Sequence, residues 1–139
     1  LQKVGEYLRF KSSLEKRLGE LAAIIAARHW SQQFEWWAHY RQAVDVGLKR
    51  EIADAGGEGR RPTGMAEDEE IVYDFSIELH ANKSVSDATY KRAFDKFGEQ
   101  GIIDLTAANA YYTFNAMMLN VARTALPAGA KAELQRFPK

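Results

Sequence analysis

The chain has 139 residues, in which 19 Lys and Arg balance 19 Asp and Glu, 46% of residues are hydrophobic and cysteine is absent. This composition is typical of a globular protein, and we expect one domain over residues 1–139. A zero formal charge gives no one-signed field, so neither nucleic acid nor a membrane is expected as a partner. Without cysteine, disulfides, thiolate zinc sites, iron–sulfur clusters and thiol chemistry are excluded for this chain.

Neither a signal peptide nor a membrane span is indicated. The first residues include the charged side chains Lys3, Glu6 and Arg9 and contain no apolar core of a signal peptide, so a cytoplasmic protein is expected. The most apolar stretch, residues 101–122, is interrupted by Asp104 and by three asparagines. It therefore lacks the roughly 18 uninterrupted apolar residues of a membrane span, and we predict a buried helix there.

Apolar residues at helical spacing predict a hairpin of two helices near the N-terminus. The first helix has Ser12 or Ser13 as its N-cap and carries an apolar stripe formed by Leu14, Leu18, Leu21 and Ile25. A break at Trp30 and Ser31 follows. The second helix has a stripe that starts at Phe34, and Gly47 helps to end it.

Further helices are predicted along the rest of the chain. A short helix over residues 49–55 is followed by a glycine-rich loop over residues 56–62. The acidic run over residues 67–70 favours the first turn of a helix, because acids complement the positive helix N-terminus. Ser86 caps the next helix, which Gly98 stops.

The last long element, about residues 99–124, is apolar nearly all round, and Pro127 ends it. Such a helix is expected to be buried on several sides. No segment shows sustained period-two alternation, so the predicted fold is all-α with about six helices. The apolar helix and the many aromatic residues exceed what one chain needs to bury, which favours a homo-oligomer.

Three polar residues of the second helix form the main candidate site. Gln32, Glu35 and His39 lie at positions i, i+3 and i+7, and so share one face. A carboxylate beside an imidazole raises the histidine pKa and orients the ring, as a general acid requires. The same spacing is also common on solvated helix faces. In an antiparallel hairpin Glu20 would join this group, or it would pair at the surface with Lys16 or Arg17.

Other candidate residues each have two interpretations. Trp36 is either a packing residue or the wall of an apolar pocket for a flat ligand. Arg60 and Arg61, in the glycine-rich loop, are either solvated or bind a substrate carboxylate. His29 and His80 are isolated and are interpreted as residues at helix ends.

Metal and phosphate sites are not expected. A metal site that used His39 and Glu35 would lack a third ligand with suitable spacing, so no metal is predicted. The glycine-rich loop lacks the Gly-Lys-Ser/Thr sequence of a phosphate-binding loop.

The spacing of Glu20, the segment WSQQFEWWAH over residues 30–39, and the later Tyr111-Tyr112 pair resemble the carboxymuconolactone decarboxylase family, which includes alkylhydroperoxidase D. The resemblance covers about residues 14–127. It implies an all-α, alkylhydroperoxidase D-like helical bundle that assembles as a trimer or hexamer. In the peroxidase branch a Glu, a Cys-x-x-Cys pair and a His form a thiol proton relay. Here Gln32 and Glu35 stand at the cysteine positions, so that relay is excluded.

The Glu35-x-x-x-His39 pattern resembles the decarboxylase branch of that family, whose members use no cofactor. The resemblance implies a lyase that acts on a small lactone or cyclic carboxylic acid. His39 would donate the proton and Glu35 and Glu20 would orient it. Gln32 and Trp36 would contact substrate, and a substrate carboxylate would be bound by Arg41, Arg60 or Arg61.

Three alternatives to a decarboxylase remain open. The same residues could catalyse an isomerisation by proton transfer. The chain could instead be a peroxiredoxin-type antioxidant protein without the redox cysteines. A non-catalytic oligomer that binds a hydrophobic ligand in a tryptophan-lined pocket is the third alternative.

Overall fold

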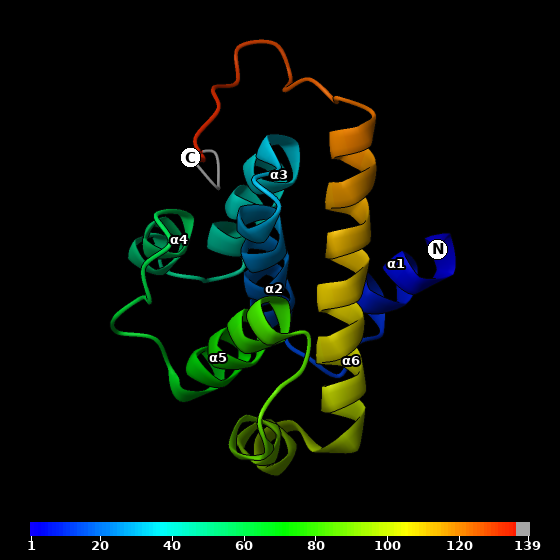
Figure 1. Cartoon of the computed structure of the whole chain (residues 1–139), viewed down its shortest axis with the longest axis vertical. Coiled ribbons are helices and arrows are strands. Elements are labelled where there is room, and N and C mark those ends of the chain that lie inside the picture. The colour runs from blue at the N-terminus through cyan, green and yellow to red at the C-terminus, as the bar shows by residue number, and fades with distance from the viewer. Residues whose placement is uncertain (136–139) are drawn as a thin grey trace.

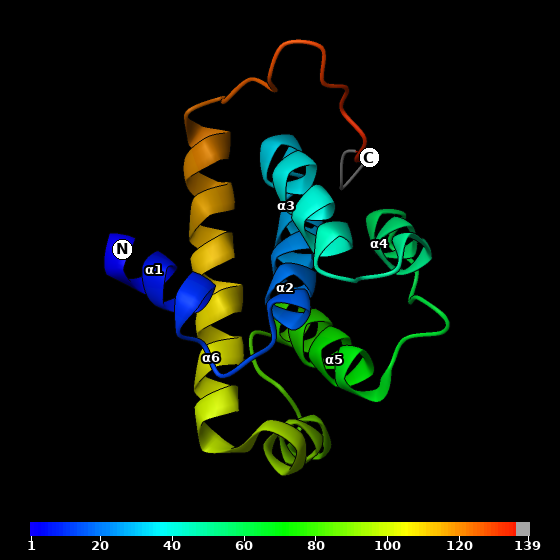
Figure 2. The same ribbon diagram turned by 180° about the vertical axis from the view of Figure 1, so that it is seen from behind.

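The computed structural model describes residues 1–135, which form six helices and no strand, as the sequence predicts. Figures 1 and 2 show them from opposite sides. In chain order the helices are α1 (Gln2–Phe10), α2 (Lys16–His29), α3 (Gln33–Asp45), α4 (Arg50–Gly57), α5 (Glu67–Asn82) and α6 (Asp87–Val121).

Helix α2 is the central element of the fold, because it contacts α3, α4, α5 and α6. Its alanine-rich sequence explains this position. Ala22, Ala23 and Ala26 are completely buried, and their small side chains let neighbouring helices approach closely from several directions. Figure 1 shows α2 with α6 on one side and α4 and α5 on the other.

The predicted break between α2 and α3 is confirmed at Ser31, whose φ angle of 47° ends the helical path. The predicted N-cap of α2 is wrong, since that position is held by Glu15. Ser12 and Ser13 instead donate hydrogen bonds from their hydroxyl groups to Asp104 of α6, at 3.0 and 2.8 Å. Burying the carboxylate of Asp104 without hydrogen-bond donors would cost more free energy than leaving a helix end exposed to water. The two hydroxyl groups therefore donate to Asp104 and do not cap α2.

The sequence pattern did not predict α1. The helix has nine residues and buries only Gly5, so it has too few residues and too little buried surface to be stable alone. Tertiary contacts hold it beside α6 (Figure 2). A Cβ atom at Gly5 would lie 2.3 Å from the Tyr111 hydroxyl oxygen, so this close approach requires glycine.

Helix α4 runs two residues further than predicted, because Gly56 and Gly57 remain helical. At Gly57 an added Cβ would lie 2.7 Å from the indole ring of Trp36. The predicted glycine-rich loop therefore begins inside a helix whose last turn packs against an aromatic side chain.

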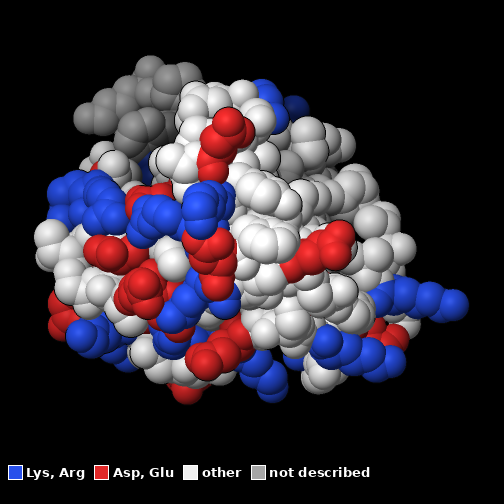
Figure 3. All heavy atoms as spheres, turned by 90° about the horizontal axis from the view of Figure 1, so that it is seen from below, with Lys and Arg blue, Asp and Glu red and all other residues white. Residues whose placement is uncertain are grey.

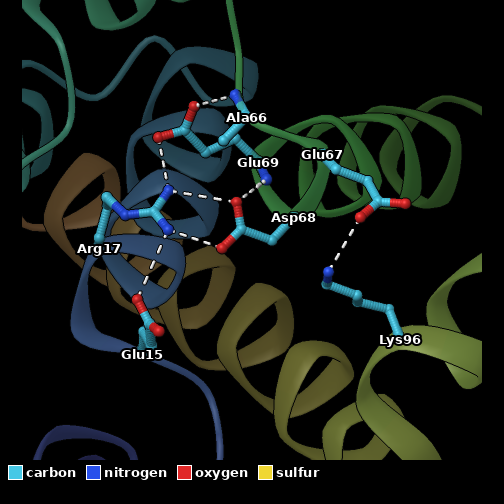
Figure 4. A network of polar contacts seen from close by, with 7 residues as sticks. All are labelled: Glu15, Arg17, Ala66, Glu67, Asp68, Glu69 and Lys96. Atoms are coloured by element: carbon cyan, nitrogen blue, oxygen red, sulfur yellow. Dashed lines mark hydrogen bonds and ion pairs between the residues drawn. The ribbon is translucent and has the colours of Figure 1, made fainter.

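The predicted start of α5 at the acidic run is confirmed, and the acids also connect helices (Figure 4). Arg17 of α2 binds Asp68 at 2.6 Å and Glu69 at 2.5 Å. Lys96 of α6 binds Glu67 at 3.0 Å. The first turn of α5 is therefore held by its neighbours as well as by the helix dipole.

Helix α6 contains a kink at Gly98, which has a φ angle of 70° and separates two helical segments. This confirms the predicted stop at Gly98. The second segment buries Leu105 and Tyr112 on its inner side. The expectation of burial on several sides is wrong for the single chain, because Met118 is 53% exposed and Val121 is 82% exposed.

The surface carries mixed charges. Figure 3 shows acidic and basic side chains intermingled at one end of the molecule, with neither sign forming a broad patch. Oppositely charged side chains of the chain also form ion pairs, for example Arg92 with Asp74 at 3.0 Å. None of the helices within residues 1–135 is both long enough and apolar enough to cross a membrane.

Candidate functional site

His39 lies between two carboxylates inside the α2–α3 hairpin. Its Nδ1 atom donates a hydrogen bond to Oε2 of Glu20 at 2.7 Å, and its Nε2 atom lies 3.3 Å from Oε2 of Glu35. The imidazole side chain is only 7% exposed. The hairpin therefore brings Glu20, Glu35 and His39 together, and the alternative in which Glu20 pairs with Lys16 or Arg17 is not what the structure shows.

The two carboxylates keep His39 protonated. Burial by itself lowers the pKa of the imidazole, but the hydrogen bond to Glu20 and the negative charges of Glu20 and Glu35 outweigh it and raise the pKa to about 9. His39 is consequently an imidazolium at neutral pH, with both ring nitrogens carrying protons. This is the protonation state that a general acid needs.

Glu35 has an unusual hydrogen-bonding position. Its contact with His39 is an ion pair that is not aligned as a hydrogen bond, so its buried Oε2 atom has no hydrogen-bond partner among the described residues. Burying a carboxylate oxygen without a hydrogen bond costs free energy, and the positive charge of His39 offsets part of that cost. Glu35 can accept a hydrogen bond or a proton there.

Tyr112 of α6 completes the group around His39. The two rings meet edge to face, with centroids 4.7 Å apart. Burial, followed by the negative charge of Glu20, raises the pKa of the Tyr112 phenol, so its hydroxyl stays protonated. Sequence reasoning counted Tyr112 only as an apolar helix residue and family feature, because nothing in its local pattern places it beside His39.

A cavity of about 410 Å³ adjoins this group. Glu20 and Tyr112 line it, together with residues of α1 and the end of α3, whereas His39 and Glu35 do not. Glu20 meets this cavity, as do the acids Glu15 and Asp45, and His39 lies one hydrogen bond away from Glu20.

Two basic residues, Arg9 and Lys16, also line this cavity. Neither forms an ion pair with another described residue. Arg9 was not among the predicted site residues, because α1 itself was not predicted. It is close enough for its positive charge to act on Tyr112.

Gln32 has a structural role at the candidate site. It is 4% exposed, and its side-chain oxygen accepts a hydrogen bond from the backbone N–H of Glu35 at 2.9 Å. This cap begins α3 and fixes the position of Glu35. Gln32 does not line the cavity beside Glu20.

Trp36 lies away from the His39 group. Its indole N–H donates to Glu133 at 3.2 Å, and its ring lines a different cavity, between α2, α4 and α5. The ring therefore packs in the core and also forms a pocket wall, which were the two interpretations of this residue.

The predicted arginines lie elsewhere too. Arg60 pairs with Glu58 at 2.6 Å, and Arg61 pairs with Asp74 at 3.1 Å, both on the exposed surface. Arg41 lies over the ring of Trp37. None of these three arginines lines the cavity at Glu20. Within the described part of the chain, no three His, Asp or Glu side chains are arranged to hold a metal ion.

Comparison with known proteins supports the fold. No family model and no curated protein matches the chain. It is similar to the crystal structure of an Agrobacterium tumefaciens protein of unknown function, named as a candidate antioxidant defence protein AhpD. The TM-score is 0.81 at 16% identity, over 91% of this chain and 88% of that chain. The chain therefore has an AhpD-like all-α fold, as the resemblance in its sequence implies.

Proposed function

We propose that this chain is an acid–base enzyme, a decarboxylating lyase or an isomerase, that acts on a small lactone or cyclic carboxylic acid. The observation that carries the proposal is the buried, protonated His39 held between Glu20 and Glu35 beside a cavity. A site with no role in proton transfer has no need to bury a charged imidazole between two acids.

In the decarboxylation, the bond between the ring carbon and the carboxylate breaks and CO₂ leaves. The electron pair passes through the ring double bond to the lactone carbonyl, which becomes an enolate. Glu20 takes the Nδ1 proton of His39 and passes it to the carbon, so that Glu20 ends as a carboxylate and His39 as a neutral imidazole, which regains its proton from water. The lactone carbonyl accepts the electrons, so this reaction needs no cofactor.

The hydroxyl of Tyr112 can donate a hydrogen bond to the enolate oxygen. It is a protonated donor at the cavity, and it forms no hydrogen bond with a described residue. A donor already in position stabilises negative charge that develops on the carbonyl oxygen. In an isomerisation, the same groups would remove a proton from one carbon and return it to another.

The substrate carboxylate is expected to bind Arg9, with Lys16 as a second cation. These two residues take the role that the sequence suggested for Arg60 and Arg61, because they line the cavity at Glu20. A guanidinium with no other ion pair binds a carboxylate without first breaking a contact.

An antioxidant role is the second candidate, favoured by the description of the Agrobacterium protein. In this chain Gln32 and Glu35 stand where the resemblance places the redox cysteines, and no cysteine occurs anywhere in the sequence. Peroxide reduction by a thiol of this chain is therefore excluded.

We also propose that the chain assembles as a homo-trimer or homo-hexamer. The exposed apolar side chains of α6, among them Ile103, Met117, Met118 and Val121, support a protein contact on that face. Sedimentation velocity of Met118→Glu should show smaller species than the unmodified chain. Lys49→Glu, on the exposed start of α4, should leave the assembly unchanged. If the unmodified chain sedimented as a monomer, this proposal would be contradicted.

The reaction is tested by NMR with a panel of carboxylated lactones in deuterated buffer, with CO₂ loss and deuterium incorporation followed together. We expect turnover by the unmodified chain and its loss in His39→Ala. His29→Ala, which changes a histidine outside this group, should retain turnover. Deuterium exchange without CO₂ loss would indicate an isomerase, whereas binding without either reaction would favour a non-catalytic ligand-binding protein.

A further inference from the structure

A second cavity, of about 280 Å³, is lined by residues of α2, α4 and α5. Figure 1 shows α4 and α5 on the side of α2 that faces away from α6. The cavity wall is mostly apolar, with Leu21, Ile24 and Ile52 among the lining residues. Two flat rings, Trp36 and Tyr73, complete the apolar part. None of the residues around His39 lines this cavity, so it is separate from the proposed proton-transfer site.

The polar side chains at this second cavity include two histidines and the positively charged Arg28. His29 and His80 stack with ring centroids 4.9 Å apart. Burial lowers the pKa of His80 to about 4 and also lowers that of His29, so both rings are neutral at pH 7. Arg28 donates a hydrogen bond to the Gln135 carbonyl at 2.6 Å. No described Asp or Glu lines the cavity.

We propose that this second cavity binds a small, neutral aromatic molecule about the size of a substituted benzene. An apolar cavity of about 150 Å³ already accepts benzene, so the space here is sufficient. The aliphatic side chains and the two flat rings would surround such a ligand on several sides. A charged ligand would lose its hydration and gain only Arg28, which is already bonded to the backbone.

Two glycines allow the two cavities to be blocked separately. Gly56 of α4 lines the second cavity, and Gly19 of α2 lines the cavity at Glu20. Both are helical, and an added Cβ at either has no atom within 4 Å. A leucine at either position is therefore accommodated by the backbone and narrows the cavity that the glycine lines.

The test is an NMR titration of the full chain with p-xylene, with methyl signals of Ile24 and Ile52 as the readout. We expect saturable binding, weakened about tenfold or more in Gly56→Leu and changed less than about twofold in Gly19→Leu. Gly56→Ala, a milder change, should give an intermediate loss. Thermal unfolding of each variant checks that it is folded.

p-Toluate, which carries a carboxylate on the same ring, should bind about tenfold more weakly than p-xylene. Three results would overturn the proposal: no saturable binding of p-xylene, equal weakening by the two leucine variants, or tighter binding of p-toluate. The last result would show that Arg28 selects an anion. All three are independent of whether the chain has lactone turnover, so this proposal and the proposed function fail separately.

Discussion

Nδ1 of His39 lies 2.7 Å from Oε2 of Glu20, and this hydrogen bond joins two neighbouring helices across 19 positions of the sequence. It places a carboxylate between the imidazole and the cavity. His39 can therefore supply a proton to a bound molecule while remaining shielded from water, and the acid–base character of the site depends on this contact.

The pKa of His39 should depend more on Glu20 than on Glu35. An NMR titration of the ring protons should give a value near 9 in the unmodified chain, because both acids stabilise the charged ring. Glu20→Gln should lower the value more than Glu35→Gln, since the Glu20 contact is shorter and better aligned. Equal effects of the two variants would contradict the assigned hydrogen bond.

Stability should fall as the pH rises from 6.5 to above 9. The pKa of His39 is raised from 6.5 to about 9 on folding, so its stabilisation is complete below 6.5 and is lost as the pH passes 9. The loss should be about 3.5 kcal/mol, from roughly 1.4 kcal/mol per pKa unit. Urea unfolding across this range measures it.

His39→Gln is the control for that measurement, and it should remove most of the decline above pH 6.5. His80 acts in the opposite direction and in another range, because its pKa is lowered from 6.5 to about 4. Its contribution is lost as the pH falls below 6.5, and it therefore does not mask the effect of His39. A decline of the same size in His39→Gln would show that another group is responsible.

Tyr112→Phe should reduce turnover about 100-fold and change substrate binding little. The substitution removes one hydrogen-bond donor to the developing oxyanion. Such a donor stabilises the transition state more than the bound substrate, so kcat should fall more than KM changes. Steady-state kinetics with the lactone that turns over gives kcat and KM separately. Tyr111→Phe, at the adjacent position, should be close to the unmodified chain, because Tyr111 does not line the cavity.

Asp104→Asn should destabilise the folded chain by about 2 to 3 kcal/mol. The pKa of this carboxyl group is lowered, because hydrogen bonds from Ser13, Gln100 and Tyr7 outweigh the opposing effect of burial. Asparagine keeps the shape but loses one acceptor. Chemical denaturation measures the change, and the exposed Asp95→Asn should differ from the unmodified chain by less than about 1 kcal/mol.

Asp104→Asn should also affect the candidate site. Asp104 of α6 accepts hydrogen bonds from Tyr7 of α1 and from Ser12 and Ser13 of the following loop, and these bonds hold α1 against α6. Arg9 of α1 lines the cavity. We therefore expect Asp104→Asn to weaken lactone binding as well. If stability fell and binding stayed unchanged, the position of α1 would not matter for the substrate.

The sequence by itself determined the helical architecture. Glycine at positions 47 and 98, the acidic run before Ile71 and the cap at Ser86 are local signals, because each acts on the backbone within one turn. The spacing of Glu35 and His39 is equally local. It fixes these side chains on one helix face whatever the rest of the chain does.

The tertiary structure alone decided which residues meet at the cavity. Glu20 and Tyr112 reach His39 only because α2, α3 and α6 pack together, and packing over such sequence separations leaves no periodic signal. Arg9 was missed for the same reason, since α1 depends on contacts with α6. Local rules therefore predict the helices of the described residues other than α1, whereas the chemistry between them follows from long-range packing of side chains.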